Sequence, residues 1–165
     1  MSAQTITTFL WFNGNAKEAV DFYTAIFPAS KVNTVARWGD GGPAPAGSIM
    51  TIAFELAGQA FIALNGGPEF PFTPAISLLV NCKTQEELDK MWIDLTADGG
   101  KPNRCGWLVD KFGVSWQVVP TGWDEVFSDA DPKRAERAMK AMLGMTKLDI
   151  EELRRAADGV EASAS

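Results

Sequence analysis

The sequence predicts an α+β protein made of two βαβββ modules followed by a pair of C-terminal helices. Two observations carry this prediction. The order strand, capped helix, strands occurs twice along the 165 residues, with a glycine- and proline-rich segment at 66–74 between the copies. An amphipathic helical pattern then covers residues 131–158. We expect the first module at 5–70, the second at 74–120 and the helical hairpin at 131–158, all within one domain.

The first module begins with a strand at residues 5–12, which are rich in β-forming side chains. Asn15 can then cap a helix, and Glu18, three residues later, completes a capping box. Apolar residues recur at helical spacing after Asn15 and give the helix one buried face, until Pro28 ends it. Further strands are expected at 30–38, 48–56 and 60–65.

The second module repeats this order. A strand is expected at 75–82, and Thr84 with Glu87 forms a second capping box for a helix that ends before Gly99-Gly100. Four residues match their counterparts at a constant offset of 68 positions: Asn13 and Asn81, Glu18 and Glu86, Val20 and Leu88, Asp21 and Asp89. Because both segments also share one order of elements, we interpret them as an internal duplication.

A β-hairpin closes the second module. Its first strand ends at Leu108-Val109, residues 110–113 form the turn, and a second strand at 114–119 stops at Pro120. Alternation places Ser115, Gln117 and Val119 on one face and Val114, Trp116 and Val118 on the face toward the helices. Within the turn, Asp110 and Lys111 are expected to be a solvated pair worth less than about 1 kcal/mol.

The C-terminal segment predicts two helices. Asp131-Pro132 is a good start for the first, whose apolar stripe runs to Gly144. The second starts near Asp149, with Glu152 completing its capping box, and runs to about Asp158. Its flanking apolar pair, Leu148 and Leu153, is placed as a hydrophobic staple. This hairpin must bury its stripe on its own sheet or on a second subunit, and the sequence leaves both open.

The composition excludes several classes of function. The chain has no histidine, which removes Ser-His, Cys-His and HExxH chemistry and the commonest transition-metal ligand. A net charge of −6 argues against nucleic acid or an anionic membrane as a partner. No apolar run approaches membrane-spanning length, and the first residues lack the features of a signal peptide. Two cysteines do not make a disulfide framework, so we expect a cytoplasmic protein.

Four segments resemble a known family. They are FLWFNGNAKEAVDFYTAIFP, ALNGGPEFPF, SLLVNCKTQEELDKMW and CGWLVDKFGVSWQVVP. In this order they are similar to the PhnB-like family, often labelled 3-demethylubiquinone-9 3-methyltransferase, of the glyoxalase/bleomycin-resistance (vicinal oxygen chelate) superfamily. The resemblance implies that the two modules curl into a cup-like mixed sheet with helices outside, and that the protein forms a homodimer.

The resemblance also implies positions for a divalent metal on the first and last strands of each module. Carried over, these positions fall on Thr8, on Phe61 or Ala63, on Ala75 and on Gln117. Metal affinity needs anionic or imidazole donors, which this set lacks. We therefore expect no metal site, even though the superfamily commonly has one.

The methyltransferase label predicts a nucleotide-type cofactor, which would need a glycine-rich turn opening a helix. Neither Gly39-Asp40-Gly41-Gly42 nor Gly66-Gly67 opens a predicted helix. We therefore expect no cofactor and treat the label as a name.

The candidate catalytic residue is Cys105. Arg104 precedes it and Lys101 lies nearby, so its thiol could become a reactive thiolate, although most free cysteines are small hydrophobic wall residues. The candidate ligand-binding residues are Gln117, Ser115, Thr8, Asn65 and Trp107.

Two of these candidates have a structural alternative, and Trp107 could line a pocket or belong to the core. Gln117 could be a satisfied buried amide, and Asn65 could hold a positive-φ turn before Gly66. By alternation from Thr8, Leu10 and Phe12 share the inward face and Trp11 packs against a helix.

Three functions stay open on this basis. The protein could be a metal-independent enzyme acting on a small, partly apolar molecule, or a protein that sequesters such a molecule without chemistry. It could also be a structural dimer whose cup is filled by side chains. The expected partners are a small-molecule ligand and a second copy of the chain, with neither nucleic acid nor membrane.

Overall fold

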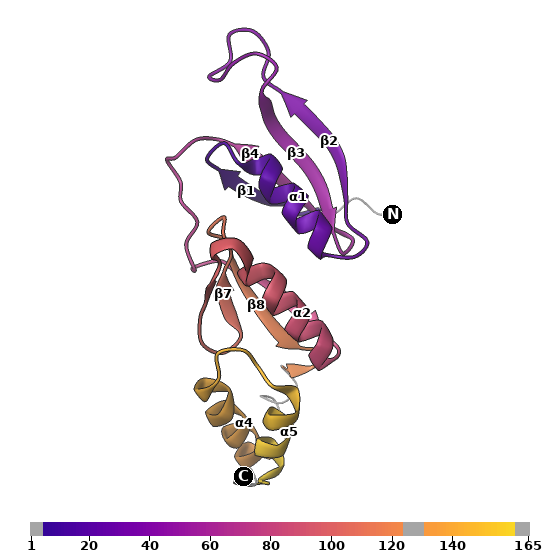
Figure 1. Cartoon of the computed structure of the whole chain (residues 1–165), viewed down its shortest axis with the longest axis vertical. Coiled ribbons are helices and arrows are strands. Elements are labelled where there is room, and N and C mark those ends of the chain that lie inside the picture. Colours follow the sequence, from indigo (N-terminus) through magenta and orange to yellow (C-terminus); the bar gives the residue numbers. More distant parts are fainter. Residues whose placement is uncertain (1–4, 124–130, 161–165) are drawn as a thin grey trace. The chain divides into compact units, whose positions relative to one another are not determined.

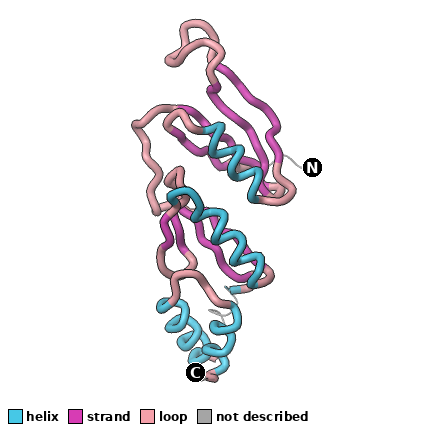
Figure 2. Tube along the Cα trace, in the orientation of Figure 1, coloured by secondary structure: helices cyan, strands magenta, loops and turns pink. Residues whose placement is uncertain are grey.

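The computed structural model describes residues 5–123 and 131–160 (Figure 1). The chain divides into two compact units, residues 1–72 and 73–165. Each unit contains a four-stranded mixed sheet and a helix that runs alongside its strands (Figure 2). The predicted α+β class and the repeated order of elements are therefore confirmed. Within the described ranges, no helix combines the length and apolarity that a membrane crossing requires.

The first unit has the sheet order β1-β4-β3-β2. Strands β1 and β4 are parallel, and the other neighbours are antiparallel. Its elements in chain order are β1 (Thr8–Phe12), α1 (Ala16–Ile26), β2 (Lys31–Arg37), β3 (Ile49–Leu56) and β4 (Gln59–Asn65). These five elements match the predicted strand, helix and three strands to within a few residues.

The core of the first unit lies between α1 and one face of its sheet. Leu10 and Phe12 of β1 are buried on this face, together with Tyr23 of α1. The prediction that Leu10 and Phe12 face a cup was therefore wrong. The opposite face carries Phe9, which is 54% exposed, and Trp11, which is half-buried. Alternation separates the two faces of a strand, but it does not say which face the helix covers.

Asn65 connects three segments of the first unit. Its Oδ1 accepts a hydrogen bond from the Ala16 N–H at the start of α1 (2.9 Å), and its Nδ2 donates to the Ile49 carbonyl (3.1 Å). Asn15 is the N-cap residue of α1, but its side chain makes no capping hydrogen bond. The predicted capping box of Asn15 with Glu18 is therefore not formed, and an amide from β4 satisfies a free donor of α1 instead.

The second unit repeats the arrangement with the sheet order β5-β8-β7-β6. Here β5 and β8 are parallel, and β8 and β6 are each antiparallel to β7. Its first elements are β5 (Leu78–Cys82), α2 (Gln85–Thr96), the short 3-10 helix η1 (Ala97–Gly99), β6 (Lys101–Pro102), β7 (Trp107–Val109) and β8 (Ser115–Pro120). The two-residue β6 was not predicted, because it is too short to show a periodic pattern.

One face of the second sheet packs against α2. Trp116 and Val118 of β8 and Leu108 of β7 are buried there with Leu88 and Leu95 of α2. This confirms the predicted orientation of Trp116 and Val118. The other face, which we call the open face, carries the alternate residues of β5, β7 and β8.

Asp110 is buried in the turn between β7 and β8, with 3% of its surface exposed. Its Oδ1 accepts the N–H groups of Phe112 (2.9 Å) and Val114 (3.0 Å), and its Oδ2 accepts the indole N–H of Trp116 (2.8 Å). Lys111 pairs instead with Asp98, at 2.9 Å. The prediction of a solvated Asp110–Lys111 pair was therefore wrong, because the carboxylate is held inside the hairpin by three donors.

The last two helices, α4 (Pro132–Gly144) and α5 (Ile150–Asp158), begin where the sequence predicts. The Asp131 side chain accepts a hydrogen bond from the first turn of α4, and Asp149 accepts the Glu152 N–H of α5. Leu148 and Leu153 are both buried, as expected for a hydrophobic staple.

The turn before β7 holds the segment between α4 and α5 through the backbone. The N–H groups of Cys105 and Gly106 donate to the Met145 and Thr146 carbonyls, both at 2.8 Å. Gly106 has φ +79, and a Cβ there would lie 2.7 Å from the Val118 carbonyl oxygen. A side chain at this position would collide with the β8 backbone and press against Leu148.

Side chains of α2 complete this attachment. Gln85 donates to the Leu148 carbonyl (3.1 Å) and accepts the Ile150 N–H (2.8 Å), and Lys147 pairs with Asp89. The segment between α4 and α5 is therefore bound to its own unit, whereas Met139 and Leu143 of the predicted apolar stripe stay exposed.

Candidate functional site

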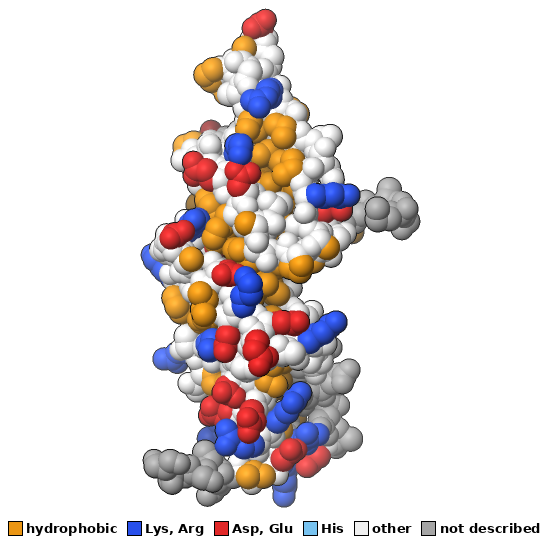
Figure 3. Space-filling model, turned by 45° about the vertical axis from the view of Figure 1, so that its right-hand side comes forward, with side chains coloured by type: hydrophobic (Ala, Val, Ile, Leu, Met, Phe, Trp, Pro, Cys, Tyr) orange, Lys and Arg blue, Asp and Glu red, His pale blue; other side chains and the backbone are white. Residues whose placement is uncertain are grey.

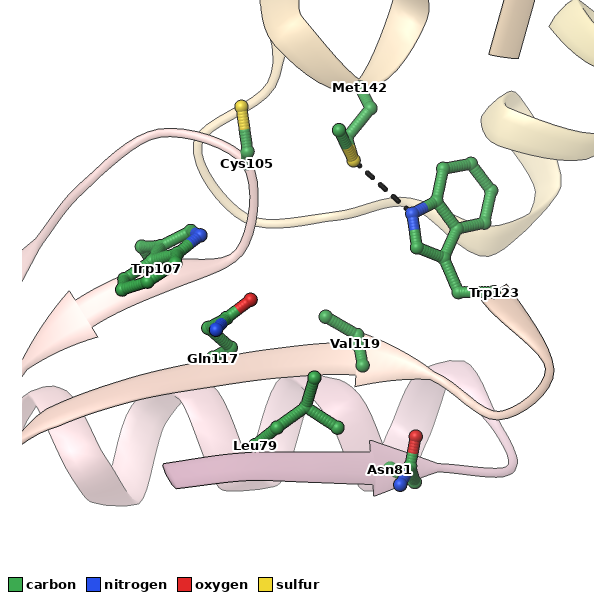
Figure 4. Close-up of a pocket in the computed structure, with 8 residues that line it drawn as sticks. All are labelled: Leu79, Asn81, Cys105, Trp107, Gln117, Val119, Trp123 and Met142. Carbon is green, nitrogen blue, oxygen red and sulfur yellow. Dashed lines mark hydrogen bonds between the residues drawn. The ribbon is translucent and has the colours of Figure 1, made fainter. Parts of the chain in front are cut away.

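A cavity of about 470 Å³ lies over the open face of the second sheet. Strands β5 and β8 supply its floor, and β7, α4 and the segments flanking these strands supply its other walls (Figure 4). The lining residues are Leu79, Asn81, Cys105, Trp107, Gln117, Val119, Trp123 and Met142. None of these eight carries a formal charge at neutral pH, so the cavity is suited to an uncharged molecule.

The floor is a square of four side chains on two neighbouring parallel strands. Leu79 pairs with Gln117 across β5 and β8, and Asn81 pairs with Val119 two residues further along. The two carboxamides therefore stand at opposite corners of the square, and the two aliphatic side chains occupy the other corners. Half of Leu79 is exposed, so the floor offers apolar surface to a ligand.

Aromatic and sulfur-containing side chains bound the rest of the cavity. Trp107 is directly paired with Gln117 across β7 and β8. Met142 reaches down from α4, and its Sδ accepts the indole N–H of Trp123 at 3.2 Å (Figure 4). These groups give the cavity polarisable walls of the kind that bind flat apolar molecules.

Gln117 is the central polar group of the cavity. Its Nε2 donates to the Ser77 hydroxyl, at 2.8 Å, just before β5. Figure 4 shows its amide oxygen directed into the space below Cys105 and Met142. The amide nitrogen is therefore bonded within the protein, as the structural alternative predicted. The amide oxygen faces the cavity.

Cys105 borders the cavity at the turn before β7. It is half-buried and has φ +59, an uncommon backbone conformation for a residue with a side chain. In Figure 4 its sulfur points away from Gln117. The other cysteine, Cys82, is buried at the end of β5, where burial and then the charge of Glu87 raise its pKa to about 11. Cys82 is therefore a neutral core thiol, as the sequence predicted.

The structure separates the predicted ligand-binding residues into two groups. Gln117 and Trp107 line the cavity, and Ser115 lies next to Gln117 on the same face of β8. Ser115 is 2% exposed, and its hydroxyl is the buried side-chain polar atom without a hydrogen-bond partner in the described residues. Thr8 and Asn65 belong to the first unit, where Thr8 shares the face of Leu10 and Asn65 caps α1.

Sequence reasoning missed half of the lining. Leu79, Asn81, Met142 and Trp123 come from separate elements, and local patterns do not indicate that they meet. Asn81 had one available signal, because a polar side chain interrupts an otherwise apolar strand there.

The residues at the superfamily's metal positions do not fit a metal ion. Thr8, Phe61, Ala63 and Ala75 offer no anionic or imidazole donor, and the Gln117 nitrogen is already bonded to Ser77. Among the described residues, no group of three or more Cys, Asp or Glu side chains is arranged to hold a metal. No chemistry through a metal follows from this donor set.

No acidic or basic side chain of the described residues belongs to the cavity lining. Acidic and basic side chains are interspersed on the face seen in Figure 3. The Asp89 side chain is 39% exposed, and the Lys147 hydrogen bond and then the Gln85 hydrogen bond lower its pKa below the ordinary value. This carboxylate serves the docking of the helical hairpin.

Comparison with known proteins gave the following matches. Residues 4–119 match the family described as 3-demethylubiquinone-9 3-methyltransferase. A Bacillus cereus PhnB protein that bears the same methyltransferase description is 39% identical, with a TM-score of 0.66, over 72% of this chain and 100% of that chain. Protein PA1353 from Pseudomonas aeruginosa is 25% identical, with a TM-score of 0.56, over 69% of this chain and 95% of that one.

A more distant match shows the fold alone. The fosfomycin resistance protein FosX from Listeria monocytogenes, solved with Mn(II) and sulfate, is 13% identical with a TM-score of 0.54, over 78% of this chain and 98% of that chain. Comparison with curated proteins gave no match.

Proposed function

Because this chain belongs to the PhnB-like family described as 3-demethylubiquinone-9 3-methyltransferase, we propose that it binds a small, neutral, partly apolar molecule, and that it does so without a metal ion. The cavity on the open face of the second unit is the binding site. Gln117 is the central recognition residue.

One observation carries this proposal. The amide oxygen of Gln117 faces an uncharged cavity of about 470 Å³ while its nitrogen is held by Ser77. An oriented acceptor among aromatic and aliphatic walls is typical of a small-molecule site. The ligand should therefore present a hydroxyl or N–H group to Gln117 and an apolar body to Leu79 and Val119. Each 100 Å² of apolar surface that it buries contributes on the order of 2.5 kcal/mol before the costs of association.

One lining residue decides whether this cavity can catalyse a reaction or only bind a ligand. Cys105 is the lining residue whose side chain can act as a nucleophile. If the protein is an enzyme, we propose Cys105 as its catalytic group. Sequestration without chemistry needs no such group. Labelling of the folded protein with an alkylating probe, followed by mass spectrometry, tests the difference. Absence of labelling at Cys105 would remove the catalytic role and leave binding.

Metal independence has its own test. We expect purified protein to contain no stoichiometric zinc, nickel, manganese or iron by elemental analysis. Ligand binding should be unchanged by a chelator, because the donor set of the cavity is uncharged. A stoichiometric transition metal that the chelator removes together with ligand binding would refute the proposal.

We also propose that the protein is a cytoplasmic homodimer. Membership of the family and the lack of a disulfide framework support this expectation. Sedimentation equilibrium measures the assembly directly, and a monomer at micromolar concentration would contradict it.

A further inference from the structure

We infer that Asn81 is a second recognition residue of this cavity, and that the ligand is a flat aromatic molecule with hydrogen-bonding groups at two opposite ends. The inference rests on the proposed function, because it concerns the same cavity. It adds a residue on β5 and a chemical class of ligand.

The register of the sheet carries the argument. Asn81 and Gln117 are diagonal neighbours on β5 and β8, and both line the cavity. Neighbouring strands lie about 4.8 Å apart and each residue rises about 3.3 Å, so diagonal neighbours on one face lie roughly 8 Å apart. Leu79 and Val119 fill the remaining corners of the square, so the surface between the two amides is apolar. A ligand that touches both amides must therefore cross this surface with an apolar body.

The orientation of the two amides defines the polar ends of the ligand. In Figure 4 the oxygens of Gln117 and Asn81 both point up from the sheet toward the cavity. Two acceptors at opposite corners favour a molecule that donates a hydrogen bond from each end. An aromatic ring substituted at opposite positions spans the diagonal and lies flat on Leu79 and Val119, beside the indole of Trp107.

The test compares a two-ended probe with one-ended analogues. The two-ended probe is 4-(hydroxymethyl)phenol, and its analogues are 4-methylphenol and benzyl alcohol, which each lack one hydroxyl group. Wild-type protein should bind the two-ended probe about threefold to tenfold more tightly than either analogue, as expected for one additional hydrogen bond. Affinity is measured by titration with detection of protein amide and indole resonances.

Two variants assign this preference to residues. Asn81→Leu should remove the preference for the two-ended probe while 4-methylphenol still binds, because the phenol keeps its contact with Gln117. Gln117→Met should also lower the affinity for the two-ended probe. Asn33→Leu and Gln59→Met make the same chemical changes on the exposed parts of β2 and β4 and should leave all three affinities unchanged.

The possible outcomes distinguish a failure of the role of Asn81 or of the ligand class from a failure of the proposed function. Retention of the full preference in Asn81→Leu would overturn the role of Asn81, with binding at Gln117 still standing. Equal affinity of wild-type protein for all three probes would overturn the two-ended ligand class. If none of the probes binds saturably to the folded wild-type protein, the proposed function itself fails.

Discussion

Replacement of Asp110 by alanine removes the acceptor of three hydrogen bonds at the turn of the hairpin that carries Trp107 and Gln117. The Val114 N–H and the Trp116 indole N–H lose their partner inside the protein, where both residues are less than 5% exposed. An unsatisfied buried donor costs about 1–3 kcal/mol. We therefore expect Asp110→Ala to lower the free energy of unfolding by about 3–5 kcal/mol.

Two further variants make the reasoning specific. Asp110→Asn keeps one carboxamide oxygen and turns an NH₂ group toward Trp116 or toward the backbone donors, so we expect a loss of about 2 kcal/mol. Lys111→Met breaks the neighbouring ion pair with Asp98 and should cost about 1 kcal/mol or less. Urea unfolding measures all three. A change below about 0.5 kcal/mol for Asp110→Ala, at an unchanged denaturant slope, would refute the account of the hairpin.

Three other predictions concern the scaffold. Asn65→Ala should lower the free energy of unfolding by about 1–2 kcal/mol because α1 loses its cap. Asn15→Ala should change it by less than about 0.5 kcal/mol, because the Asn15 side chain makes no capping hydrogen bond. Equal losses of the two variants in thermal unfolding would contradict the assignment of the cap to Asn65. Cys82, whose pKa is raised to about 11, should resist iodoacetamide at pH 8 in folded protein and react when denatured, as mass spectrometry would show; labelling at equal rates would contradict its burial. The pKa of Asp89 is lowered in the folded protein, so its ionised carboxylate stabilises the fold above about pH 4, and this stabilisation is lost as the pH falls through the folded-state pKa. Lys147→Met should therefore lose less stability on acidification than wild type. An equal or greater loss would contradict the pairing.

Local features of the chain were predictable from the sequence. The caps of α4 and α5 at Asp131 and Asp149, and the staple formed by Leu148 and Leu153, depend on residues a few positions apart. Their hydrogen bonds and contacts form within one turn of helix, so a sequence pattern contains all of their participants.

Features that depend on contacts formed only in the folded sheet or hairpin were not predictable in the same way. Asn65 caps a helix that begins 49 residues earlier, and only the assembled sheet brings the two together. Asp110 has the composition of an exposed turn, yet the folded hairpin places Trp116 over it. In β1, alternation gave the correct two faces, but the position of α1 decides which face is buried.

The candidate site shows the same division. The alternation of β8 places Gln117 and Val119 on the open face, and the sequence predicted this. Asn81 comes from a parallel strand 36 positions earlier than Gln117, and Met142 comes from a helix near the C-terminus. Their meeting is a property of the sheet register and of the docking of α4, which no local pattern encodes.

The most direct measurement is a titration of chelator-treated protein with 4-(hydroxymethyl)phenol, followed by nuclear magnetic resonance. Metal-independent binding predicts saturable shifts of the Gln117 side-chain amide and of the Trp107 and Trp123 indole resonances, with no metal added. Shifts that appear only after a divalent metal is supplied, or the absence of any saturable shift at these three residues, would contradict metal-independent binding in the cavity of the second unit.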